Sequence, residues 1–223
     1  GSDLYVYDGT FYKIVDDAYD GNWNHIVVSY NNTTNEVKGY KNGVLDQTVS
    51  ATWSNQSFIG FLGARNGIRQ FNGLLSNFGI FTGTLDQTAV TSLYNSGTPL
   101  VDMSSFTSLD GFWKLDNLTT GIQDSKGSNN GTNNAATEIQ TNVWTPRLNG
   151  ESTTLPSTAL VSSDLQFESP YSNFSLDFDG TNDYIDCNNI SALSATQKFS
   201  ISYWFNVDSL SNFKRFLGTY NDT

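Results

Sequence analysis

Short apolar segments rich in β-branched and aromatic residues recur along the first hundred residues. They occupy residues 25–30, 36–40, 44–49, 58–63 and 74–81. Asn, Gly and Thr separate them, which is typical of strands joined by turns. Asn42-Gly43 lies between two of these segments, and a type I′ hairpin turn favours this dipeptide because both central residues need positive φ. The pattern predicts antiparallel strands.

One segment has helical periodicity instead. Thr84 and Gln87 have the spacing of a capping box, and Asp86 would complement the helix dipole in the first turn. Apolar side chains at residues 89, 90, 93 and 94 then share one helical face. Gly97 and Pro99 follow and would end the helix. The sequence therefore predicts one short helix.

The chain changes character after about residue 100. Residues 100–172 are rich in Ser, Thr, Asn and Gly, which is typical of a linker, and apolar residues there form small islands. Strand patterns return at residues 174–178 and 199–205. Many short strands with one short helix predict an all-β protein, an antiparallel β-sandwich.

Composition and charge narrow the possible partners. The 223 residues carry 22 acidic and 11 basic side chains, a formal net charge of -11. Nucleic acid is excluded as an expected partner, because binding phosphates requires clustered Lys and Arg. No apolar run approaches the ~20 residues that span a bilayer, so membrane insertion is not expected. One Cys and one His exclude an internal disulfide framework and any site that needs two imidazoles.

Four motifs in the first part of the chain follow one another in a specific order. They are WNHIVVSY at residues 23–30, GYKNG at 39–43, FNGLLSNFGIF at 71–81 and LYNSG at 93–97. This order resembles the second half of a concanavalin A-like, laminin G-like jelly-roll domain. The resemblance implies a strand, a hairpin, a further strand and a short helix.

The later part of the chain resembles the beginning of the same kind of domain. Its motifs are FWKLD at residues 112–116, DSKGSNNGT at 124–132, LDFDGTNDYID at 176–186 and FSISYWF at 199–205. The motifs of the family's C-terminal half therefore precede those of its N-terminal half in this chain. Two explanations stay open: a circularly permuted sandwich, completed within the chain or by exchange between neighbouring chains, or a window cut from a tandem array.

Physical chemistry favours completion of the sandwich. Half a sandwich would expose apolar faces and unpaired strand edges to water. We therefore expect one laminin G-like sandwich assembled from residues 1–99 and residues 104–223. The alternative is two half-domains of a tandem array.

Catalysis is not expected, although some relatives of this sandwich are glycosidases. A retaining glycosidase needs two carboxyl groups about 5 Å apart. The four glutamates, at positions 36, 138, 151 and 168, lie in different segments. The sequence thus predicts a protein that is not an enzyme.

Calcium is the metal that the resemblance implies. Laminin G-like domains often hold a metal at the sandwich edge, and the matching positions here are Asp124, Asn129 and Asp179. Their oxygen atoms suit Ca²⁺, which takes six to eight oxygen ligands. The alternative, of equal weight, is that these side chains only form turns.

Four other side chains are candidates for ligand binding. Trp53 and Trp144 lie outside the expected strands, and Arg65 and Arg69 flank a loop Asn-Gly. Indole rings can stack on sugars, and arginines can contact a carboxylate-bearing sugar. The alternatives are that the tryptophans cap the sandwich edge and that the arginines offset the acidic surface.

Together these features predict a non-catalytic binding module of an extracellular or virion-surface protein, which recognises a glycan or a protein. The alternative is a structural subunit of a fibre, tail or capsid decoration. In that case other copies of the chain would be the partners, because the halves of one copy would complete its neighbours.

Overall fold

The computed structural model describes residues 2–7, 10–51, 59–64, 69–140, 147–148, 165–166, 174–190, 198–208 and 217–218. Antiparallel strands dominate, with one helix, α1 (Gln87–Tyr94), followed by a 3-10 turn, η1 (Asn95–Gly97). The strands are β1 (Leu4–Tyr7), β2 (Phe11–Val15), β3 (Asn24–Asn31), β4 (Glu36–Lys41), β5 (Val44–Ser50), β6 (Ile59–Leu62), β7 (Asn72–Thr82), β8 (Leu109–Trp113), β9 (Thr132–Asn134), β10 (Thr137–Gln140), β11 (Arg147–Leu148), β12 (Leu165–Gln166), β13 (Phe174–Asp179), β14 (Tyr184–Asn189), β15 (Lys198–Val207) and β16 (Leu217–Gly218). The predicted all-β sandwich with one short helix is confirmed. In this part of the chain, no helix has the length and hydropathy to cross a membrane.

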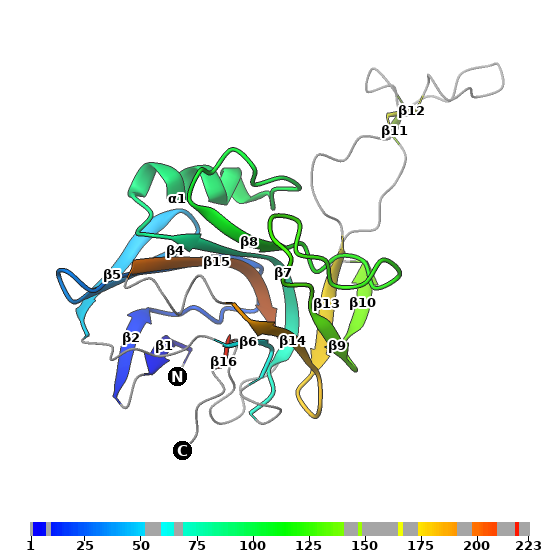
Figure 1. Ribbon diagram of the computed structural model, residues 1–223, viewed down its shortest axis with the longest axis horizontal. Coiled ribbons are helices and arrows are strands. Elements are labelled where there is room, and N and C mark those ends of the chain that lie inside the picture. The colour runs from blue at the N-terminus through cyan, green and yellow to red at the C-terminus, as the bar shows by residue number, and fades with distance from the viewer. Residues whose placement is uncertain are drawn as a thin grey trace.

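One large sheet organises the molecule. Its strand order is β10-β13-β7-β15-β3-β4-β5, and β8 also pairs with β7. Two strands pair with the same edge of β7. β13 pairs with the first residues of β7, and β8 pairs with the last ones. The hairpin β1–β2 and a four-stranded sheet, β16-β6-β14-β9, lie on one side of this large sheet, and α1 lies on the other (Figure 1).

Strands from distant parts of the sequence are neighbours in the large sheet. The late strand β15 lies between the early strands β3 and β7 and pairs antiparallel with both. β13 likewise pairs with β7. The sheet is therefore continuous within one chain. Circular permutation, the division into residues 1–99 and 104–223, and the tandem-array alternative all stay predictions.

The main core fills the space between the large sheet and the strands that face it. Alternate side chains of β15, including Ile201, Tyr203 and Phe205, point into this core because successive residues of a strand face opposite sides. They pack with residues of the facing strands such as Ile14 and Ile185, both of which are completely buried. This two-sided packing is that of a sandwich.

Helix α1 covers the opposite face of the large sheet. Val90 and Leu93 are fully buried in a second apolar cluster with Phe81 and Met103. The predicted start of the helix was wrong: its N-cap is Asp86, whose carboxylate accepts the backbone N–H of Ala89 at 2.8 Å. Capping by Asp86 fits its extended backbone, which is the usual N-cap conformation.

The side chain of Gln87 also has a different role from the predicted capping box. Its amide nitrogen donates to the carbonyl oxygen of Gly43, in the turn between β4 and β5, at 2.6 Å. The predicted Asn42-Gly43 turn is confirmed, with φ of 50° and 82° at the two residues. Gln87 thus ties the helix to this turn.

Replacing Gly39 by Ala is expected to lower the free energy of unfolding by about 1–3 kcal/mol, because a Cβ there overpacks the core. That atom would lie 1.9 Å from the carbonyl oxygen of Ile14, on the strand β2 that packs against it. Denaturant titration measures the change. The control Lys38→Ala, on the same strand, should stay within about 0.5 kcal/mol. Equal stability of the two variants would contradict the close approach of β2 and β4.

Candidate functional site

The structure describes one of the four predicted ligand-binding residues, Arg69. Trp53, Arg65 and Trp144 lie outside the described residues. Arg69 is exposed and has a φ of 57°, immediately before the segment that leads into β7. Ligand binding by these four residues stays a prediction.

Asp124 organises a loop through its carboxylate. The backbone N–H groups of Phe112, Lys126 and Gly127 donate to its Oδ1 at 3.0, 3.1 and 2.9 Å. Its Oδ2 accepts the N–H of Asn129 at 3.2 Å. The side chain is buried, so these bonds satisfy a carboxylate that would otherwise be costly to remove from water.

Asn129 takes part in this loop through its backbone. Its carbonyl oxygen accepts the indole N–H of the fully buried Trp113 at 2.8 Å. The loop also needs a glycine, since a Cβ at Gly127 would lie 2.6 Å from Oδ2 of Asp124. The hydrogen bonds of Asp124 and Asn129 therefore support the turn-forming alternative at this loop.

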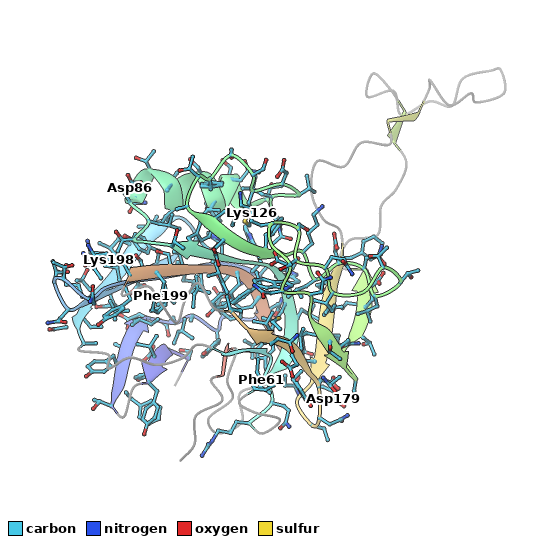
Figure 2. All side chains as sticks on the ribbon, viewed as in Figure 1. Phe61, Asp86, Lys126, Asp179, Lys198 and Phe199 are labelled. Atoms are coloured by element: carbon cyan, nitrogen blue, oxygen red, sulfur yellow. The ribbon has the colours of Figure 1, made fainter. Side chains whose placement is uncertain are left out.

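Asp179 belongs to a different part of the sandwich. It is the exposed last residue of β13, and its Oδ1 accepts the N–H of Thr181, in the turn towards β14, at 2.7 Å. In the sheet register Asp179 pairs with the first residue of β7, whereas Asp124 bridges Trp113, which lies opposite Phe78 farther along β7. Figure 2 shows the same separation between Asp179 and Lys126, a neighbour of Asp124.

The three predicted calcium ligands thus do not form one set. Among the residues that the structure describes, no group of three or more His, Cys, Asp or Glu side chains is arranged to hold a metal ion. Calcium binding by this chain stays a prediction.

The end of β13 carries several carboxylates close together. The pKa of Asp177 is raised, chiefly by burial. The negative charges of Asp208, Asp183 and Asp179 raise it further. Burial also raises the pKa of Asp183, whose Oδ2 accepts the N–H of Asp179 at 2.7 Å. This hydrogen bond indicates that Asp183 stabilises the turn after β13.

His25 is packed beneath helix α1. Its Nε2 lies 2.8 Å from the hydroxyl of Ser202, and its ring centre lies 5.1 Å from that of Trp204 and 6.0 Å from that of Tyr94. Its side chain is almost completely buried, and this burial lowers the pKa of His25 to about 3. His25 is thus a packed, hydrogen-bonded side chain of the core.

The hairpin β1–β2 presents three aromatic rings to solvent. Tyr5, Tyr7 and Phe11 are 48%, 48% and 52% exposed. The register pairs Tyr7 with Phe11 and Tyr5 with Lys13, so these four side chains share one face. The hairpin buries its other face, which includes Ile14, against the core. Side chains of this hairpin project away from the sandwich in Figure 2.

The ring of Phe11 contacts both tyrosine rings. The ring centres of Tyr7 and Phe11 are 4.7 Å apart at a tilt of 44°, and those of Tyr5 and Phe11 are 6.3 Å apart with the rings perpendicular. We call Tyr5, Tyr7 and Phe11 the aromatic platform. Contiguous exposed aromatic surface of this kind is typical of a binding site.

Sequence reasoning missed this platform because it looked for ligand contacts among tryptophans and arginines. A signal was present: in Leu4-Tyr5-Val6-Tyr7 the two tyrosines alternate with aliphatic residues and must share one face of a strand. The sequence does not tell which face the core covers, and that decides whether the tyrosines are exposed.

Comparison with known families gives one match. Residues 4–91 match the family model of the concanavalin A-like lectin/glucanases superfamily, of laminin G type, which confirms the predicted resemblance. The matched segment includes the aromatic platform and strands β1 to β7. No curated protein and no solved structure matches the chain. The family match supports a carbohydrate- or protein-binding module.

Replacing Asp124 by Ala is expected to lower the free energy of unfolding by about 3 kcal/mol, because four backbone donors lose a charged acceptor. Asp186→Ala is the control: its Oδ1 accepts a backbone bond from Asn188, and the loss of this bond should cost about 1 kcal/mol. Both are measured by denaturant titration, with chelator and with millimolar calcium. Calcium that stabilises the unmodified chain but not Asp124→Ala would instead assign a metal to this loop.

Lowering the pH from 7 to 5 is expected to remove about 2 kcal/mol of stability that depends on His25. The folded pKa is about 3 and the unfolded value about 6.5, so between these values the unfolded chain binds a proton that the folded chain excludes. Stability therefore falls as the pH falls. His25→Gln should lose about 2 kcal/mol less over the same range in denaturant titrations, because it removes the chain's one histidine. Equal pH dependence in both proteins would contradict a neutral buried His25.

Proposed function

We propose that this chain is a non-catalytic glycan-binding module and that the aromatic platform is its contact surface. The observation that carries the proposal is the position of the platform. Three exposed rings, of which Phe11 contacts both tyrosines, lie within the segment that matches a superfamily of lectins and glucanases.

The chemistry of the platform suits a sugar. Aromatic rings offer flat apolar area against which the C–H face of a pyranose packs, and burial of that area drives association. Tyr5 and Tyr7 also carry hydroxyl groups that exchange hydrogen bonds with a polar ligand. Asp3 lies beside them, with its Oδ2 accepting from the Tyr5 hydroxyl at 3.4 Å. Apolar faces bordered by a few polar groups are typical of small-ligand sites.

Two of the four glutamates have structural contacts that support a role without catalysis. Glu36 accepts the hydroxyl of Thr34 at 2.9 Å, and Glu138 accepts the backbone N–H of Leu118 at 2.7 Å. Glu151 and Glu168 lie outside the described residues. A module that binds glycans without cleaving them fits an extracellular or virion surface, and this location is part of the proposal.

Tyr7→Ala and Phe11→Ala are each expected to weaken binding to a polysaccharide at least about tenfold, because a central aromatic contact of an interface contributes more than about 1.4 kcal/mol. Affinity electrophoresis through gels with neutral polysaccharides, followed by calorimetry on those that retard the protein, measures the effect. Phe174→Ala is the control, since Phe174 is an exposed aromatic on β13 of the large sheet, outside the hairpin.

Unchanged binding by both hairpin variants would show that the binding site does not include the platform. Failure of the unmodified chain to bind any glycan, together with capture of a protein ligand that needs Tyr7, would replace glycan by protein as the partner.

A further inference from the structure

We infer that the aromatic platform selects neutral glycans and rejects acidic ones, because carboxylates border it and the lysine on its face is already paired. This inference rests on the proposed function and adds the class of ligand to it. Its basis is the set of contacts around Lys13, Asp3 and Asp16.

Lys13 is the cation that an acidic sugar on the platform would meet. It pairs with Tyr5 in the hairpin register and shares the exposed face with the three rings. Its Nζ lies 2.5 Å from Oδ1 of Asp16 and 4.0 Å from Oδ2 of Asp3. A ligand carboxylate would have to compete with Asp16 for this ammonium group.

Asp3 is held in place at the edge of the platform. Its Oδ1 accepts the backbone N–H of Asp17 at 3.1 Å, while its Oδ2 contacts the Tyr5 hydroxyl and Lys13. The side chain of Asp17 accepts the hydroxyl of Ser2 at 2.6 Å and adds a third carboxylate. The carboxylates of Asp16 and Asp3 thus lie within 4.0 Å of one ammonium group, so the local charge is negative.

The pairing of Lys13 and Asp16 persists at neutral pH. The hydrogen bond with Asp16 raises the pKa of Lys13, and the same bond holds the pKa of Asp16 below its usual range. Both groups therefore stay charged where glycan binding would take place. Lys41, the last residue of β4, is also paired: its Nζ lies 3.2 Å from Oδ2 of Asp20.

These charges discriminate between two classes of ligand. A uronic acid, sialic acid or sulfated sugar would bring a negative group against Asp3 and Asp16, and like charges in contact disfavour a partner. A neutral sugar has hydroxyl groups that donate to the same carboxylates, and such charge-assisted bonds are strong. The expected ligand is therefore a neutral polysaccharide.

The test uses pairs of polymers that share a backbone and differ in charge. Galactomannan, xyloglucan and dextran are each compared with their carboxymethylated forms by calorimetry on the full chain. We expect at least one neutral polymer to bind, and its carboxymethylated form to bind at least tenfold more weakly at 20 mM salt. The difference should narrow at 300 mM salt, where exposed charges are screened.

A double variant, Asp3→Asn with Asp16→Asn, identifies the groups responsible. It should reduce the preference for the neutral polymer to less than threefold, because the carboxymethylated form no longer meets carboxylates and the neutral polymer loses its charge-assisted bonds. The control, Asp86→Asn with Asp102→Asn, changes the net charge equally at two exposed positions. Asp86 caps α1 on the opposite side of the large sheet (Figures 1 and 2), and Asp102 precedes Met103, which packs against α1. Asn also serves as an N-cap, so this variant keeps the helix.

Each remaining outcome contradicts a specific statement. Absence of binding to every polymer, neutral or carboxymethylated, would overturn the proposed function. Binding of a carboxymethylated polymer as tightly as its neutral form would overturn the selectivity and leave glycan binding intact. A preference unchanged in the Asp3→Asn, Asp16→Asn variant would also overturn it, since the selectivity would then come from other groups.

Discussion

The pairing of β15 with both β3 and β7 is the constraint on which the rest of the structure depends. A central strand is buried on both faces, and β15 is correspondingly apolar on its inner side and small or aromatic on its outer side. Outward-facing Ser200 accepts the backbone N–H of Leu85 at 3.0 Å, and Ser202 contacts His25. One late strand therefore closes the sheet, fills the core and anchors the segment that leads into α1.

The aromatic platform follows from how the sandwich covers its core. The inner face of the large sheet is covered by several short elements, of which the β1–β2 hairpin is one. This hairpin uses Leu4 and Ile14 to close the core and has no described layer over its other face. Aromatic residues are favoured in strands, but their exposure at three positions on one face adds nothing to the core. The proposed binding role would account for the exposure of Tyr5, Tyr7 and Phe11.

The sequence predicted well those features that depend on local pattern. The Asn42-Gly43 turn, the strands around it and the short helix all follow from neighbouring residues, and each is present. Features that depend on long-range placement were harder to predict. The motif that contains Asp124 and the one that contains Asp179 both looked like loops at one edge, but pairing along β7 places them apart. The helix start was missed because Thr84 and Asp86 are both good N-caps, and only backbone geometry separates them.

Charge acts at two scales in this protein. The net charge of -11 disfavours polyanions in general, but screening limits that effect to about 8–10 Å at physiological salt. Selectivity at a binding surface must therefore come from groups that touch the ligand. The exposed ion pair of Lys13 and Asp16 adds little to stability, because exposed pairs gain little in water. The pair lies beside the platform, however, and there it affects binding. Asp16 already occupies the ammonium group that an acidic ligand would need, and the groups left to contact a ligand are carboxylates.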